Sequence, residues 1–154
     1  MGFSTKGRYA TMAMLDLALH YGEGPVLVKD IAARQGLSER YLEHLLLSLK
    51  VGGLVKSSRG THGGFVLSRP PTELTVRDII QVTEGSMAPA DCVDEPDAYP
   101  RSGSCAIHEL WTELKAAIDG VLQSTTLQDL LSRQRRRWAS GQPKEYADTH
   151  TGGR

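Results

Sequence analysis

Three residues in the middle of the chain have the side-chain chemistry of a metal or redox site. Cys92, Cys105 and His108 supply two thiols and one imidazole, and these groups suit zinc or an iron–sulfur cluster. Cys105 and His108 are three residues apart at the start of an expected helix, so both ligand atoms can lie on one face. Two unrelated thiols and a surface histidine would give the same spacing. The pattern therefore indicates a metal site, a redox-active thiol or no site.

The segments around these residues determine whether they can meet. Residues 85–105 contain prolines and no periodic apolar pattern, so we expect a loop that holds both cysteines. A long helix is predicted from about Ala106 to Gln123 because apolar residues recur at helical spacing. Thr126 then begins a last helix, with Asp129 at its third position as in a capping box.

The first half of the chain has the pattern of a helix-turn-helix. Helices are expected over about 4–21 and 28–35, followed by a turn that contains Gly36 and a third helix capped by Ser38. The apolar face of that third helix consists of Leu42, Leu45, Leu46 and Leu49. If this face is buried, Arg40, Glu43 and His44 point outward, where a recognition helix meets base edges. A three-helix core with a solvated outer face gives the same pattern.

A predicted β-hairpin follows the third helix. Residues 54–59 and 65–68 read as short strands joined by the glycine-rich segment 60–64. A helix-turn-helix followed by such a hairpin is the winged-helix plan, in which Arg59 suits the narrow minor groove. The alternative is an ordinary glycine-rich turn. The fold class we predict is mainly α with a small β-hairpin wing and a long dimerisation helix.

The predicted DNA-binding surface combines the third helix, the tip of the wing and the start of the first helix. Its residues are Lys6, Arg8, Ser38, Arg40, Tyr41, Glu43, His44, Arg59, Thr61 and His62. A carboxylate such as that of Glu43 can accept a hydrogen bond from a cytosine amino group. Lys6 and Arg8 are expected to contact phosphates, which makes binding depend on salt.

Composition limits the classes of protein that fit. The chain has 154 residues, 40% hydrophobic and 23% charged, and a formal net charge of zero. Residues 1–70 carry nine Lys/Arg against five Asp/Glu, whereas residues 71–110 carry two against eight, so a basic half precedes an acidic segment. No apolar run approaches the roughly 18 residues of a membrane span, and no catalytic motif is present. We expect a cytoplasmic protein that is neither an enzyme nor membrane-bound.

The expected domain organisation has four parts. Residues 1–84 form the winged helix-turn-helix, 85–105 a cysteine-containing sensor loop, 106–137 the dimerisation helices and 138–154 a flexible tail. A winged-helix unit is already complete in about 80 residues. The apolar long helix is therefore expected to pack against a second copy in a C2 dimer. Packing within one chain is the alternative.

Several motifs in order resemble the iron–sulfur cluster regulator (IscR) type of bacterial transcription factor. The resemblance covers residues 4 to about 131. It rests on Ser4-Thr5-Lys6-Gly7-Arg8-Tyr9-Ala10, Ile31-Ala32, Tyr41-Leu42-Glu43, Arg59-Gly60, Gly63-Gly64-Phe65-Val66-Leu67, Cys92, Ser104-Cys105, His108-Glu109-Leu110-Trp111 and Thr125-Thr126-Leu127.

The resemblance implies a homodimeric winged-helix protein that binds a palindromic operator in double-stranded DNA and reads bases with Glu43 and Arg59. It also implies that Cys92, Cys105 and His108 occupy positions that hold a [2Fe-2S] cluster in some members. Tyr99 stands in place of the middle cysteine. A nearby carboxylate or the partner chain would then supply the fourth ligand. For these three residues, the alternatives to a cluster are a thiol sensor without a cluster and an inert remnant. For the whole protein, the alternative function is an iron–sulfur carrier or interaction module that does not bind DNA.

Overall fold

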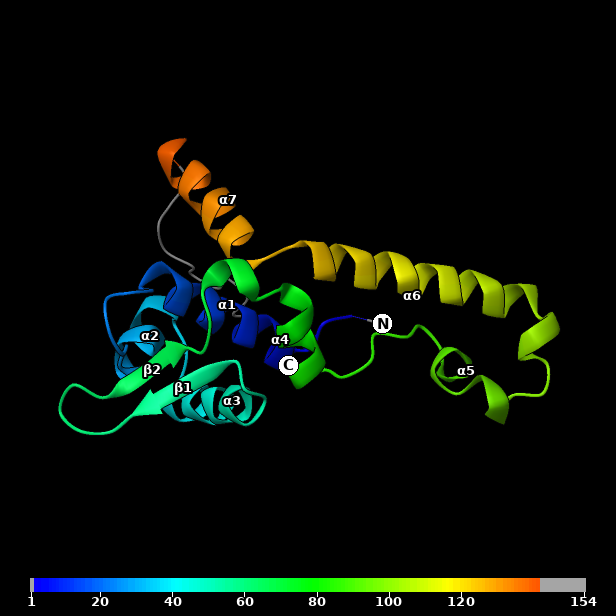
Figure 1. The fold of residues 1–154 in the computed structure, drawn as a ribbon, viewed down its shortest axis with the longest axis horizontal. Coiled ribbons are helices and arrows are strands. Elements are labelled where there is room, and N and C mark those ends of the chain that lie inside the picture. The colour runs from blue at the N-terminus through cyan, green and yellow to red at the C-terminus, as the bar shows by residue number, and fades with distance from the viewer. Residues whose placement is uncertain (1, 142–154) are drawn as a thin grey trace.

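The computed structural model describes residues 2–141 and shows a mostly helical protein with one two-stranded antiparallel sheet. The elements are α1 (Thr5–Leu19), α2 (Val28–Gln35), α3 (Glu39–Val51), β1 (Val55–Ser58), β2 (Gly64–Leu67), α4 (Val76–Thr83), α5 (Asp91–Asp94), α6 (Ala106–Ser124) and α7 (Leu127–Ala139). Short 3-10 turns lie at Pro71–Glu73, Pro96–Ala98 and Ser102–Ser104. Figure 1 shows α6 extending as a long arm from the body that holds α1 to α4 and the sheet.

Helices α2 and α3 form the predicted helix-turn-helix. α2 ends at Gly36, whose φ of 66° is a left-handed conformation that glycine adopts readily. Ser38 caps α3 by accepting a hydrogen bond from the Tyr41 backbone N–H at 3.2 Å. The four leucines of the expected apolar face are all buried. The helix boundaries predicted here are confirmed.

Val26, in the connection between α1 and α2, holds the hairpin to the helical body. β1 and β2 pair antiparallel from Val55↔Leu67 to Ser58↔Gly64. The Val26 N–H donates to the Phe65 carbonyl, and the Phe65 N–H donates to the Val26 carbonyl, both at 2.9 Å. Gly64 has a φ of 143°, and a Cβ there would collide with the Val26 backbone. The absence of a side chain thus lets the wing lie against this connection.

The C-terminal helix α7 returns to the winged-helix body. Leu127 and Leu131 join the main core, which also contains Met14 and Leu42. The Leu127 N–H donates to the Leu74 carbonyl at 2.9 Å, beside the start of α4. α4 and α7 therefore begin next to each other, although long α6 separates them in sequence.

Both helices begin with complete capping boxes, Thr75 with Asp78 and Thr126 with Asp129. Hydrogen bonds from the Thr126 backbone and hydroxyl lower the pKa of Asp129. The cap predicted at Thr126 is confirmed. Hydrogen bonds between near neighbours therefore start α7, the helix that returns to the core.

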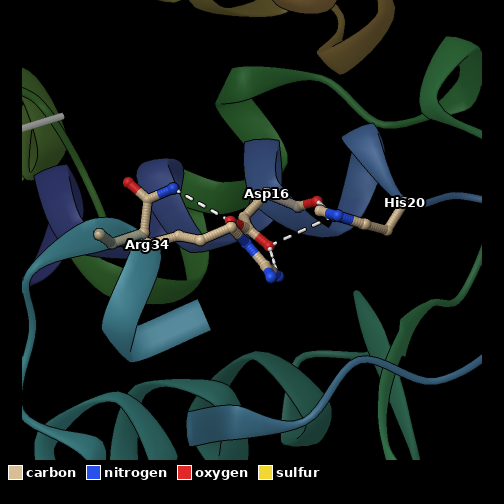
Figure 2. A network of polar contacts seen from close by, with 4 residues as sticks. Asp16, His20 and Arg34 are labelled. Carbon is tan, nitrogen blue, oxygen red and sulfur yellow. Dashed lines mark hydrogen bonds and ion pairs between the residues drawn. The ribbon is translucent and has the colours of Figure 1, made fainter. Parts of the chain in front are cut away.

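A buried carboxylate ties α1 to α2 (Figure 2). Asp16 is 1% exposed and accepts from Arg34, through Nε at 2.9 Å and Nη2 at 2.8 Å. Gln35 Nε2 donates to the same carboxylate at 3.2 Å, and His20 Nδ1 lies 3.5 Å from it. The hydrogen bond with Asp16 raises the pKa of Arg34. Because a buried charge needs partners, this network orients the first helix of the helix-turn-helix.

The segment predicted as an irregular loop contains short helical turns. α5 and two 3-10 turns lie within residues 91–104. Local hydrogen bonds explain them: Ser86 Oγ donates to Asp94 Oδ1 at 2.8 Å, and Ser102 Oγ donates to the Pro96 carbonyl at 2.9 Å. Turns of three or four residues are too short to give a periodic apolar pattern, so the sequence did not indicate them.

Several boundaries differ from the sequence predictions. α1 ends at Leu19 rather than near residue 21, and the strands are Val55–Ser58 and Gly64–Leu67 rather than 54–59 and 65–68. The flexible tail was expected from residue 138, but Trp138 and Ala139 are the last residues of α7. The remainder of the predicted tail, residues 142–154, lies outside the described residues.

Candidate nucleic-acid interface and sensor loop

The outer face of α3 presents most of the predicted base-reading residues together. Ser38, Arg40, Glu43 and His44 are exposed. They line an open hollow of about 520 Å³ together with Tyr41 and Leu47. Such a face, with donors, acceptors and an apolar group, has the chemistry that distinguishes base pairs in a major groove.

Two residues on α3 differ from the sequence expectation. Tyr41 was expected on the DNA-binding surface, but its side chain is half-buried. Its ring packs edge-on against Tyr9 of α1, with ring centroids 5.9 Å apart, and so helps to join α1 to α3. Leu47 was not among the predicted residues, yet its side chain is 46% exposed beside Glu43 and His44. The signal for Leu47 was present: it is the one leucine of α3 outside the buried face.

The wing tip carries the other predicted residues. Arg59, Thr61 and His62 are exposed in the connection between β1 and β2. The Gly63 N–H donates to the Gly60 carbonyl at 3.0 Å, which closes a tight turn at the tip. Figure 1 shows this tip extending beyond the helical body. The tip is therefore accessible to a ligand the size of a duplex.

Lys6 and Arg8 lie in the first turn of α1, which is distant from α3 in sequence but packs against that helix. Arg8 is exposed and Lys6 is half-buried. The residue between them, Gly7, is buried. The two cations are thus supported by a closely packed turn.

The sensor loop brings two of the three predicted ligands together. Cys92 of α5 places its Sγ 3.4 Å from Nδ1 of His108, in the first turn of α6. The other ring nitrogen, Nε2, lies 3.5 Å from Thr112 Oγ1, and the Thr112 hydroxyl donates to the His108 carbonyl at 2.9 Å. The imidazole is therefore held between a thiol and a hydroxyl.

Cys105 lies apart from this contact. It precedes α6 and lines an open hollow of about 880 Å³ that also includes His108 and Glu109. Within residues 2–141, no group of three or more Cys, His, Asp or Glu side chains is arranged to hold a metal ion. A [2Fe-2S] cluster takes four protein ligands. In this conformation, the described residues do not bring together a ligand set that fits such a cluster.

α6 exposes an apolar face along most of its length. Ile107, Leu110 and Val121 are 60%, 52% and 65% exposed, whereas Leu122 is the only buried residue of the helix. The apolar seam has intervals of three and four residues, a heptad spacing, and consists of Ile107, Leu110, Leu114, Ala117 and Val121. Such spacing is typical of helices that pack along one another. A separate finding is that no helix among the described residues has the length and apolarity to cross a membrane.

Comparisons with known proteins agree with this architecture. Residues 3–133 match the family Rrf2, described as an iron-dependent transcriptional regulator. The chain is 45% identical over 132 residues to the HTH-type transcriptional regulator CymR of Bacillus subtilis, covering 86% of this chain and 91% of that protein. It is 38% identical over 157 residues to the HTH-type transcriptional regulator IscR of Serratia proteamaculans, covering 94% and 95%.

Solved structures give the same result. The structure of CymR, the global cysteine regulator of B. subtilis, is similar with a TM-score of 0.73 and 44% identity, and covers 86% of this chain and 98% of its own. The structure of T. potens IscR has a TM-score of 0.71 and 45% identity, with coverage of 86% and 88%. These relatives are regulators rather than enzymes. The chain therefore belongs to the Rrf2 family and is a DNA-binding transcriptional regulator of the winged-helix type.

Proposed function

We propose that this regulator binds a palindromic operator in double-stranded DNA as a cytoplasmic homodimer, and that the Cys92–His108 pair is its redox sensor. The observation that carries the proposal is the arrangement of α6. Its arm bears the sensor at one end, adjoins the winged-helix body at the other and exposes an apolar seam between them.

The apolar seam favours pairing of α6 with its copy. Three of its side chains are at least half exposed in one chain, and burying them would remove that apolar surface from water. A helix of 19 residues is about 28 Å long, which allows several turns of contact. Two α6 helices related by a C2 axis would place two winged-helix units on one assembly, as a palindromic site requires. Of the expected dimerisation segment 106–137, residues 106–124 are accordingly proposed as the dimer contact, because α7 packs against its own winged-helix body.

The α3 face and the wing tip are proposed as the DNA-binding surface. Glu43 accepts from a cytosine amino group, and Arg40 donates to guanine or phosphate. Leu47 adds an apolar group suited to the methyl group of thymine. The remaining contacts are proposed for Lys6, Arg8, Ser38, Tyr41, His44, Arg59, Thr61 and His62.

The sensor is proposed to act through thiol chemistry at Cys92. A thiolate is the form that oxidants attack, and the adjacent imidazole of His108 can accept the thiol proton. Oxidation by hydrogen peroxide would convert the Cys92 thiol to a sulfenic acid with release of water, which places a larger and more polar group in this contact. Since His108 lies in the first turn of α6, the change would act on the helix proposed to set the separation of the two recognition helices. A coupling of about 1–3 kcal/mol between the two sites is ordinary.

A [2Fe-2S] cluster on Cys92, Cys105 and His108 is the competing assignment. Anaerobically purified protein should be analysed for iron and sulfide and its visible spectrum recorded before any oxidant is added. We expect colourless protein whose DNA binding responds to peroxide. Stoichiometric iron and sulfide with a visible chromophore would overturn the thiol sensor and favour the cluster.

DNA binding itself is tested by selecting genomic fragments on the full chain and measuring the affinity of the selected site at several salt concentrations. The proposed function predicts sequence-selective binding that weakens steeply as salt rises. Failure to retain any fragment in both the reduced and oxidised states would favour a carrier or an interaction module instead.

A further inference from the structure

The first turn of α1 is held by a carboxylate from a distant helix end. Glu84 directly follows α4, and its Oε1 accepts hydrogen bonds from the Ser4 backbone N–H at 2.8 Å and the Gly7 backbone N–H at 3.2 Å. The Ser4 hydroxyl also donates to the same oxygen. One carboxylate oxygen thus meets three donors at the N-terminus of α1.

This contact shares the donor of the ordinary local cap. The Ser4 hydroxyl is 3.4 Å from the Gly7 N–H, which is a long hydrogen bond, whereas Glu84 is closer to that same N–H. A Cβ at Gly7 would collide with the Glu84 carboxylate, so the glycine admits the acid. A negative charge at a helix N-terminus is also favoured by the helix dipole.

The two residues that flank Gly7 are Lys6 and Arg8, the proposed phosphate contacts. Their backbone geometry is determined by the turn that Glu84 caps, because that turn begins at Ser4 and contains Gly7. On the other side of Glu84, Gly85 has a φ of 73° and begins the sensor loop. Glu84 therefore lies between the sensor loop and the basic first turn of α1.

We infer that Glu84 is a positioning residue for DNA binding: its carboxylate caps α1 and so fixes Lys6 and Arg8 for contact with the phosphate backbone. The inference rests on the proposed DNA-binding function and deepens it. It also predicts that an acid, which alone would repel phosphates, strengthens DNA binding here because it orders two cations.

The test compares Glu84→Ala and Glu84→Gln with the wild-type chain on the selected operator, over a series of salt concentrations. Each lost phosphate contact should make the slope of log affinity against log salt shallower by about 0.9. We expect Glu84→Ala to weaken binding and to reduce the slope by about 1 to 2. Glu84→Gln keeps an acceptor oxygen and should restore most of the slope.

Two further measurements separate positioning from general stability. Glu73→Ala removes an exposed acid from the same body and should leave the slope unchanged. In the Glu84→Ala background, adding Lys6→Ala should reduce the slope less than it does in the wild-type chain. A lower affinity with an unchanged slope, or tighter binding by Glu84→Ala, would overturn the inference, whereas a wild-type chain that binds no DNA would instead overturn the proposed function.

Discussion

Replacing Leu110 by glutamate tests whether α6 is the dimer interface. Leu110 lies in the apolar seam and is 52% exposed in one chain. Full burial of a leucine side chain contributes about 1.5–3 kcal/mol, so covering the exposed half would contribute about 0.8–1.5 kcal/mol in each copy. The two copies of a C2 dimer together would contribute about 1.5–3 kcal/mol.

This energy corresponds to about a 10- to 150-fold increase in the dimer dissociation constant, because about 1.4 kcal/mol is a factor of ten. Two carboxylates introduced into an apolar seam add a desolvation cost, so this range is a lower bound. Glutamate and leucine have similar helix propensities, and α6 itself should remain helical.

Sedimentation velocity over a dilution series of the full chain measures the dissociation constant directly. Ala116→Glu is the matched control, because it introduces the same charge at an exposed position of α6 outside the seam. We expect dissociation of the Leu110→Glu dimer and weaker operator binding, with neither change in the control. Equal dissociation constants for the Leu110→Glu variant and the wild-type chain would refute the assignment of the seam.

Three other substitutions test the remaining parts of the proposal. Glu43→Ala should reduce discrimination at one base pair by about 1–3 kcal/mol, measured with singly substituted operators; discrimination equal to that of the wild type at every position would remove Glu43 from base reading. Cys92→Ala should abolish the response of DNA binding to peroxide without changing the dimer dissociation constant, and a response that persists would contradict the thiol sensor. Asp16→Asn should lower the free energy of unfolding by roughly 1.5–3 kcal/mol, because the paired hydrogen bonds from Arg34 lose their charged acceptor; urea denaturation with an unchanged midpoint would show that the network adds no stability.

The elements of the winged-helix body could be predicted because their signals are local. Ser38 and Thr126 cap helices with their own hydroxyls, and Gly36 ends α2 in a left-handed conformation. A cap hydrogen bond spans about three residues, so it is visible in any short stretch of sequence. The buried face of α3 was predictable for the same reason, since helical spacing alone identifies it.

The candidate sites could be predicted only in part. The sequence named Cys92, Cys105 and His108 as one group, but the structure brings Cys92 to His108 and leaves Cys105 outside that contact, on an open hollow that His108 also lines. Nothing in the spacing of 13 residues between the cysteines determines how the intervening turns fold. Leu47 was missed although the spacing of the other four leucines already left it outside the buried face of α3.

Other features depend on contacts between residues distant in sequence. Asp16 reads as an ordinary polar position of a helix, yet it is buried against Arg34. Glu84 reads as the polar end of α4, yet it caps a helix 80 residues earlier in the chain. By itself the sequence determined the longer helices of the winged-helix body, most of their ends and the hairpin, because hydrogen bonds between near neighbours decide most of these. Only the tertiary structure decided which charges are paired, which thiol meets the imidazole and which face of α6 is left uncovered, because those contacts exist only once the helices have packed.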